Sequence, residues 1–418
     1  MKQIKPDFKR VKYSDFWLIG MMIILMFIGL VMIYSASSGQ LALAKESPTA
    51  YLKKQAGWMA VSLVIFVIAS YRPQNFRGRF PLNFLLVICL TALQLGLDLI
   101  GPRINGAAGW VALGPISFQP AEFLKLINVI YFAEVLLGKS KNMKWLTLGI
   151  FVMQMIAILA APDLGGLAIN LMIYLVMLIA ALKIIFRWRF MWGVIPVIIM
   201  IYIATYIASV KKFVPFIPAY QAERIKNFTN PFDYVQTSGR QLVHSYYAIS
   251  NGGWTGVGIG NSIEKQGYLP EPYTDFILSI ISEEWGVIGV SLILLLLAGL
   301  ICRIIILGSR TRSLYNTLVC YGIATFIFTG AVFNIGGMLG MLPLTGVTLP
   351  FISYGGSSLF VLTLSLGIVN KIAIQTKLGE DELEQREILR SLRPQGTQMS
   401  VKRRPQRPVN PSQGPTRR

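Results

Sequence analysis

The sequence predicts an all-α integral membrane protein with about ten transmembrane helices, both termini in the cytoplasm, and one long extracytoplasmic loop between spans seven and eight. Three observations predict this fold. Hydrophobic residues make up 54% of the 418 residues and charged residues only 14%, whereas a soluble domain carries about 25% charged residues. The apolar residues form runs long enough to cross a bilayer. The basic residues gather in alternate short connections, as they do on the cytoplasmic side of membrane proteins.

About ten apolar runs reach or approach the roughly 20 residues that a membrane span requires. In chain order they are Phe16–Ser38, Gln55–Tyr71, Phe80–Ile100, Glu122–Leu137, Trp145–Ala161, Gly165–Ile185, Met191–Val210, Phe276–Ile301, Tyr315–Leu339 and Phe351–Ile374. The second, fourth and fifth runs are short, and Pro162 nearly joins the fifth to the sixth. The count is therefore ten, give or take about one.

Positive charge orients the spans and divides the chain. With the N-terminus inside, the inner connections hold most of the basic residues, and the short outer loops hold little beyond Lys45, Lys53, Lys54 and Arg103. Residues 1–15 are then a basic cytoplasmic N-terminus, residues 16–374 a membrane domain, and residues 375–418 a disordered basic cytoplasmic tail rich in Pro, Gln and Arg. This placement accounts for the net charge of +20, so no nucleic-acid partner is predicted.

The large extracytoplasmic loop, residues 211–275, is not simply polar. It contains "FVPFIPAY", an amphipathic "QAERIKNF" and the glycine-dense "SNGGWTGVGIGNS". Its acidic and basic residues nearly balance. Long loops with some regular structure of their own are usually functional. We expect short interfacial helices that pack on the outer membrane face, rather than a separate domain.

Several kinds of active site are missing from the sequence. There is no Walker A loop, no Rossmann fingerprint and no H-E-x-x-H, and Gly256, Gly258 and Gly260 lack the βαβ context of a nucleotide loop. The three cysteines fall within or at the ends of spans, without a C-x-x-C pair or metal spacing. A reaction on the outer face must therefore use a substrate that arrives already activated, which points to a lipid-borne one.

The stretch "YLPEPYTDFILSIISEEWG", Tyr268–Gly286, places a carboxylate at the mouth of the eighth span. A helix dipole favours an anion there, so Thr274 or Asp275 as an ordinary helix cap is one interpretation. Two prolines before Asp275 favour the other, a positioned functional group. Glu283 lies about 12 Å deeper on an ideal helix and Glu284 nearly opposite Asp275. We expect one of these acids to face a cavity with Asp275 and the other to pair with a base or a neighbouring helix.

Four further residues carry ionisable groups in unusual places. Glu122 and Lys125 share a helix face, either as an interfacial salt bridge or with Lys125 binding an anionic headgroup. Asp163, in "APDLGG", interrupts the membrane region, either as a helix cap or as part of a binding site. His244 is the only histidine, and we interpret it as a packed polar residue rather than a catalyst.

Four motifs resemble the SEDS family, the shape, elongation, division and sporulation proteins of the bacterial wall. They are "SNGGWTGVGIGNSIEKQGYLPEPYTDFILSIISEEWGVIG", "NIGGMLGMLPLTGVTLPFISYGGSSL", "PDLGG" and "NGAAGW…QPAEFLKL", in the family's order and spacing. The resemblance covers the first to the tenth span and is closer to the cell-division branch than to the rod-elongation branch.

The resemblance implies a membrane glycosyltransferase that polymerises lipid II into glycan strands on the outer face of the bacterial cytoplasmic membrane. It implies a class B penicillin-binding transpeptidase as partner, with other divisome proteins and membrane lipids around it at the division septum. Asp275 matches the family's essential acid, and Trp110, Glu122 and Lys125 match further family positions.

The expected mechanism makes Asp275 the general base that deprotonates an acceptor sugar hydroxyl. Positive charge for the departing pyrophosphate would come from Lys125, Arg224, Arg240 or Lys265, or from a divalent cation such as Mg²⁺ or Mn²⁺, and the sequence leaves these sources open. Glu283 is a further candidate for substrate binding. Trp110 either stacks on a sugar ring or anchors the membrane interface.

Two alternatives come from other classes of protein. A lipid flippase or proton-coupled transporter would depend on Asp163, Glu283 or Glu284 more than on Asp275, because transport sites lie near the midplane. A structural scaffold that recruits wall enzymes would not need the Asp275 carboxylate at all.

Overall fold

The computed structural model of the protein describes residues 8–72, 80–100, 109–113, 116–138, 149–154, 163–185, 230–237 and 239–391. The predicted span Met191–Val210, most of Trp145–Ala161, the first part of the large loop with Arg224, and the end of the tail lie outside these residues. The chain divides into two compact units, Met1–Thr376 and Lys377–Arg418. The candidate site belongs to the first.

The described chain is helical apart from one small hairpin. The α-helices are α1 (Phe16–Leu43), α2 (Ala50–Tyr71), α3 (Phe80–Ile100), α4 (Pro120–Leu137), α6 (Leu164–Ile185), α9 (Arg240–Gly252), α10 (Ile277–Arg310), α11 (Leu314–Met338) and α12 (Gly356–Ser391). Short 3₁₀ turns are η1 (Phe8–Tyr13), η3 (Pro231–Tyr234) and η4 (Glu264–Gln266). Strands β1 (Val111–Leu113) and β2 (Ile116–Phe118) pair antiparallel, with Val111 opposite Phe118.

Six of the described helices are long and apolar enough to cross a membrane. They lie in α1, α2, α6, α10, α11 and α12, and each overlaps a predicted span. Helix α3 holds a shorter apolar stretch, Leu82–Leu97. Helix α4 carries three charged residues, two of which are paired with each other, Lys125 with Glu122 at 2.6 Å. The third, Glu134, accepts a hydrogen bond from Asn83 of α3 at 3.1 Å. The protein is therefore a helical, multi-pass membrane protein.

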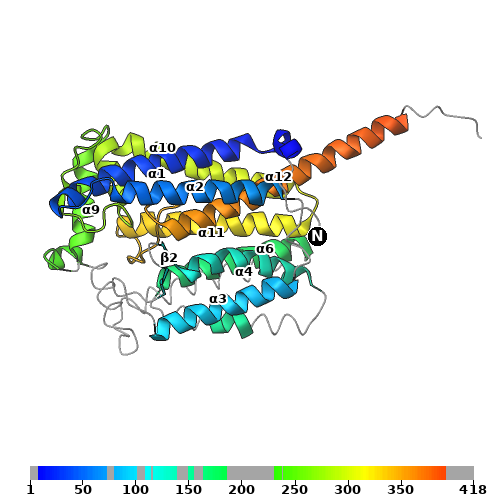
Figure 1. Ribbon diagram of the computed structural model, residues 1–418, viewed down its shortest axis with the longest axis horizontal. Coiled ribbons are helices and arrows are strands. Elements are labelled where there is room, and N and C mark those ends of the chain that lie inside the picture. The colour runs from blue at the N-terminus through cyan, green and yellow to red at the C-terminus, as the bar shows by residue number, and fades with distance from the viewer. Residues whose placement is uncertain are drawn as a thin grey trace, which may run out of the picture. The chain divides into compact units, whose positions relative to one another are not determined.

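The helices of the first unit lie side by side with their long axes roughly aligned (Figure 1). Helix α10 contacts α1, α9 and α11, helix α11 also contacts α4 and α6, and α3 packs on α4. Met22, Leu278, Ile323 and Leu366, from four of these helices, are fully buried in one hydrophobic core. Helix α9 stands across the end of the bundle where α1 ends and α10 begins (Figure 1).

A buried ion pair fastens the opposite end of the bundle. Asp15 is the N-cap of α1, and its carboxylate accepts a hydrogen bond from the Leu18 backbone N–H at 3.0 Å. Arg303 of α10 pairs with the same carboxylate, with Nε 3.0 Å from Oδ1. The Asp15 N–H donates to the Asn370 side chain of α12 at 2.9 Å. Asp15 thus links α1, α10 and α12, with its carboxylate on Arg303 and its backbone N–H on Asn370.

The tenth predicted span begins later than the apolar run suggests. Helix α12 starts at Gly356, whereas the run starts at Phe351. Phe351 has a positive φ of 64°, which a bulky residue rarely adopts and which a helix excludes. Residues 345–356, here called the 345–356 turn, are instead bonded to other segments of the chain, and this context overrides the local apolar pattern.

Helix α10 is broken at Gly286, where φ is 66° and ψ is −169°. Only glycine adopts this conformation routinely. The break lets the Gly253–Gly258 segment of the loop pair with the helix backbone. The Val257 N–H donates to the Glu283 carbonyl at 2.9 Å, and the Val287 N–H donates to the Gly253 carbonyl at 3.0 Å. The loop is therefore bonded to the helix main chain itself.

Replacing Gly286 with alanine should destabilise the protein by at least about 2 kcal/mol, because the conformation is strained for any other residue. A Cβ there would also lie 2.4 Å from the Trp254 carbonyl oxygen. Thermal unfolding in detergent would measure the loss. Gly57→Ala in α2, where a Cβ meets nothing within 4 Å, is the matched control and should unfold like the parent. Equal unfolding temperatures for the two variants would contradict this account of the break.

Candidate active site

Asp275 lies directly before α10, at the end of the bundle that α9 crosses. The N-cap of α10 is Phe276, whose side chain makes no capping hydrogen bond. Thr274 Oγ1 donates instead to the Glu271 carbonyl at 3.1 Å. The helix-cap interpretation of Thr274 or Asp275 is therefore not what the structure shows. Asp275 is partly exposed.

The backbone that carries Asp275 is held at three consecutive carbonyl groups. The Tyr354 N–H donates to the Tyr273 carbonyl at 2.9 Å, and Ser353 Oγ donates to the Thr274 carbonyl at 2.6 Å. Asn334 Nδ2 of α11 donates to the Asp275 carbonyl at 2.9 Å. A segment with each carbonyl bonded to a different neighbour cannot shift without losing these bonds, so the carboxylate starts from a fixed backbone.

The 345–356 turn also brings Asp163 into this neighbourhood. A Cβ added to Gly346 would lie 3.7 Å from Asp275 Oδ2. A Cβ added to Gly165, at the start of α6, would meet the side chain of Val347 at 2.4 Å. Asp163 itself accepts a hydrogen bond from the Gly166 N–H at 2.8 Å, which is how an N-cap bonds. The stretch Asp163–Gly166 is thus a capped helix start that packs on the turn beside Asp275.

Glu283 is fully buried and bonded to the large loop rather than to Asp275. Its Oε1 accepts from Asn251 Nδ2 at 2.8 Å and from the Ile263 N–H at 3.0 Å. Its Oε2 accepts from the Ser262 hydroxyl and from the Glu264 N–H. With four donors from its own chain and no exposed surface, Glu283 does not reach a substrate in this arrangement. It fixes the loop.

Glu284 forms a buried ion pair with Lys265 of η4. Lys265 Nζ lies 2.7 Å from Glu284 Oε1 and 3.0 Å from the Ser35 hydroxyl of α1. The Ser35 hydroxyl also donates to Glu284, at 2.7 Å from Oε1. The expectation that one of the two acids pairs with a base therefore describes Glu284, and its base comes from the loop. This pair fastens α1, α10 and the loop at one point.

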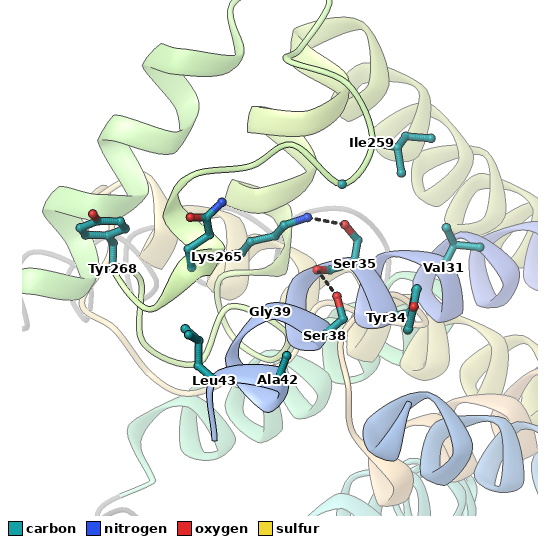
Figure 2. Close-up of a pocket in the computed structure, with 12 residues that line it drawn as sticks. Val31, Tyr34, Ser35, Ser38, Gly39, Ala42, Leu43, Ile259, Lys265 and Tyr268 are labelled. Carbon is teal, nitrogen blue, oxygen red and sulfur yellow. Dashed lines mark hydrogen bonds between the residues drawn. The ribbon is translucent and has the colours of Figure 1, made fainter. Parts of the chain in front are cut away.

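A cavity of about 740 Å³ lies between α1 and the loop beside this ion pair (Figure 2). Seven residues from one stripe of α1 line one wall, and Ile259, Gly260, Lys265, Gln266 and Tyr268 line the other. In Figure 2 the Lys265 side chain runs toward Ser35, so its charge is directed to its partners at the wall. Asp275 is not among the lining residues.

Arg240 and His244 hold the loop to α9. Arg240 donates to the carbonyls of Gly267 and Tyr268, with its Nη2 2.8 Å from the Gly267 oxygen. His244 Nδ1 lies 2.7 Å from Glu264 Oε2, and its ring stacks near Tyr268 with centroids 6.0 Å apart. Burial raises the pKa of the Glu264 carboxyl above its usual value, although His244 acts in the opposite direction. These contacts agree with the interpretation of His244, the only histidine of the sequence, as a packed polar residue.

The remaining predicted residues lie around the hairpin and α4. Trp110 directly precedes β1 and is partly exposed. The Gln119 N–H, just after β2, donates to Ser357 Oγ at the start of α12, at 3.2 Å. Lys125 is buried, paired with Glu122, and its Nζ lies 5.5 Å from the Phe326 ring centroid of α11. The salt-bridge interpretation of this pair is confirmed.

Sequence reasoning missed Asn334 and Ser353 as parts of the site. Both sit inside motifs that were singled out, "NIGGMLG" and "FISYGG", but their partners lie 59 and 79 positions away. Among the described residues, no three His, Cys, Asp or Glu side chains gather into a metal site.

The chain matches a known family over most of its length. The family of cell cycle proteins designated FtsW, RodA and SpoVE matches residues 16–378. The "Probable peptidoglycan glycosyltransferase FtsW" of Lactococcus lactis is 34% identical over 387 residues, covering 86% of this chain and 92% of that protein. "Stage V sporulation protein E" of Bacillus subtilis is 34% identical over 369 residues, covering 86% of this chain and 96% of that protein.

Two solved structures resemble the fold. One, described as "Structural coordination of polymerization and crosslinking by a peptidoglycan synthase complex", gives a TM-score of 0.68 at 25% identity and covers 87% of this chain and 98% of that chain. The other is the rod shape determining protein RodA of Thermus thermophilus, with a TM-score of 0.60 at 24% identity, covering 86% of this chain and 96% of that chain.

The Lys265–Glu284 pair should show strong coupling in a double-mutant cycle. Lys265→Met leaves a buried carboxylate without its cation, which costs about 3–5 kcal/mol, and Glu284→Met leaves the ammonium without its anion. The double variant should lose less stability than the two single losses added together. Thermal unfolding and limited proteolysis of the loop would measure this, with Lys53→Met, an exposed lysine of α2, as control. Additive losses would show that the two groups are not coupled.

Proposed function

The chain belongs to the family of cell cycle proteins designated FtsW, RodA and SpoVE, and from this membership we propose that it is a peptidoglycan glycosyltransferase of bacterial cell division. It is the SEDS family that the motifs resemble. The substrate is lipid II, a disaccharide-peptide joined through pyrophosphate to a polyprenol, and the product is a glycan strand. Relatives named FtsW support the division branch over the elongation branch.

The proposed topology has ten spans, both termini in the cytoplasm, and residues 211–275 on the outer face. The helices of six described spans and the basic inner connections support it. In this topology Asp275 lies at the outer membrane boundary, where a lipid-linked sugar and a growing strand can both reach it. The protein works at the division septum with a class B penicillin-binding transpeptidase, and the synthase complex among the similar structures supports such a partner.

The proposed chemistry is a single displacement. Asp275 takes the proton from the acceptor sugar hydroxyl as its oxygen attacks the anomeric carbon of the donor. The bond from that carbon to the pyrophosphate oxygen breaks, and its electron pair leaves with the polyprenyl pyrophosphate. One displacement inverts the configuration at the anomeric carbon. The observation that carries the proposal is the Asp275 backbone, fixed at three successive carbonyls beside a partly exposed carboxylate.

Positive charge stabilises the leaving pyrophosphate. The candidates that we retain are Lys125, Arg224, Arg240 and Lys265, and they differ in what they already bind. Lys265 is committed to Glu284, and Lys125 is paired with Glu122. Arg240 uses two of its donors on loop carbonyls, while its guanidinium carries further N–H groups. Trp110, before the hairpin, is the proposed sugar-stacking residue near α4.

Asp275→Asn should lower glycan polymerisation to the rate that remains without a general base, in a protein that still folds, because an amide cannot accept the acceptor proton. General-base catalysis contributes about 10²- to 10⁴-fold in rate. The measurement is polymerisation of purified lipid II by the purified protein, with and without its transpeptidase. Asp233→Asn, at an exposed position of η3 in the same loop, is the control and should keep full activity.

Equal glycan synthesis by wild type and Asp275→Asn would support the glycosyltransferase activity but show that Asp275 is not its general base. Absence of synthesis from both, with the transpeptidase present, would reject the glycosyltransferase itself.

Ser353→Ala should lower kcat about tenfold or more while leaving KM nearly unchanged, because displacement of a catalytic group by even about 1 Å is costly. The hydroxyl of Ser353 donates to the Thr274 carbonyl and accepts from the Leu349 N–H at 2.9 Å. Ser353→Thr keeps the hydroxyl and should recover most of the rate. Ser365→Ala, a buried serine that bonds only within α12, is the control. A change in KM alone would argue against a positioning role.

A further inference from the structure

Three tyrosines from distant parts of the chain meet beside the Asp275 segment. Tyr51 is in the first turn of α2, Tyr273 lies two residues before Asp275, and Tyr354 lies in the 345–356 turn. The Tyr51 and Tyr273 rings stack with centroids 4.4 Å apart and planes at 28°. Tyr354 meets Tyr51 edge to face at 5.0 Å and Tyr273 at 5.9 Å. We call these three side chains the tyrosine cluster.

The tyrosine cluster is only partly buried. All three of its residues pack against the hydrophobic core and still keep exposed surface. Burial of aromatic surface is what stabilises a packed cluster, so the surface that these tyrosines leave exposed is available to a ligand.

The hydroxyl groups of the tyrosine cluster suit a polar ligand. The Tyr273 hydroxyl donates to the Tyr51 hydroxyl at 3.1 Å, which leaves the Tyr51 hydrogen to point elsewhere. Burial, with the neighbouring tyrosines, raises the pKa of Tyr273, and burial also raises that of Tyr354. Both groups therefore remain neutral hydrogen-bond donors. Lys54 Nζ lies 5.8 Å from the Tyr51 ring centroid, so the cluster also has a cation at its rim.

The cluster is tied to Asp275 by the same bonds that fix the catalytic backbone. The Tyr354 N–H donates to the Tyr273 carbonyl, and the next residue of the turn, Gly355, donates its N–H to Gln55 Oε1 of α2 at 3.4 Å. Trp58, one turn further along α2, fills the space beside Gly356, where a Cβ would lie 2.2 Å from the indole. A ligand on the cluster is thus held at a fixed offset from the carboxylate.

We propose that the tyrosine cluster is a carbohydrate-binding subsite that holds a pyranose ring of the glycan next to Asp275. Aromatic faces attract the C–H groups of a sugar ring, and phenolic hydroxyls bond to its equatorial oxygens. The inference rests on the proposed function for the identity of the sugar, an N-acetylhexosamine of the strand. The binding surface itself comes from ring geometry and exposure.

The first test measures binding without catalysis. The full-length Asp275→Asn protein in detergent is titrated by calorimetry with soluble, lipid-free β-1,4-linked N-acetylhexosamine chains cut from peptidoglycan. Tyr51→Leu in this background should raise Kd about tenfold, since it removes a stacking ring but keeps an apolar side chain. Tyr51→Phe keeps the ring and should raise Kd by a smaller factor. Tyr234→Leu, an exposed tyrosine of η3, is the control and should bind like the parent.

The second test measures catalysis in the protein that keeps Asp275. Tyr51→Leu should raise KM for lipid II and shorten the glycan strands, with kcat nearly unchanged. A packing role would instead lower kcat and the unfolding temperature together and leave KM alone.

Unchanged Kd in folded Tyr51→Leu overturns the subsite, whatever the polymerisation assay shows. If Tyr51→Leu does not fold, Tyr51→Phe decides, and an unchanged Kd for that variant has the same meaning. If Tyr51→Leu weakens glycan binding but the wild-type protein polymerises nothing, the proposed function is rejected and the carbohydrate site stands. The two failures are therefore distinguishable.

Discussion

Two adjacent buried carboxylates, Glu283 and Glu284, determine how the large loop meets the membrane bundle. Charge buried in a low-dielectric interior is costly unless it is paired and hydrogen-bonded, and here each carboxylate finds its partners in the loop. Glu283 collects four donors from residues 251–264, and Glu284 takes Lys265. If the loop detached from the bundle, both buried carboxylates would lose their hydrogen-bond and ion-pair partners.

The break at Gly286 completes this attachment and separates two roles along α10. The first turns of the helix follow Asp275, and the next ones carry the carboxylates that anchor the loop. Asp275 lies just before α10 and Glu283 eight residues after Asp275, so one short stretch of backbone joins the proposed base to the attachment of the loop.

The sequence predicted the features that depend on local pattern. The apolar runs located every described membrane helix, and the three-residue spacing of Glu122 and Lys125 placed them on one helix face, where an ion pair was one of two interpretations. It did not predict what depends on contacts between distant segments. Nothing in the sequence around Glu283 indicates that Ser262 and Asn251 bond to its carboxylate. The apolar run that begins at Phe351 likewise gives no sign that Phe351 has a positive φ, which a helix excludes. The tyrosine cluster was missed for the same reason, since its members are 222 and 303 positions apart from Tyr51.

The placement of the acids also decides between catalysis and transport. A transporter must let its membrane acids exchange partners during each cycle, so those acids cannot be strongly bound in a single arrangement. Glu284 is held by Lys265 and Ser35, Glu283 by the loop, and Asp163 caps α6. Releasing either buried glutamate from its partners would cost several kcal/mol. Asp275 differs from the two buried glutamates, because its backbone is fixed while the residue remains partly exposed at the end of the bundle. A fixed backbone at a partly exposed residue suits the general-base role that we propose for Asp275.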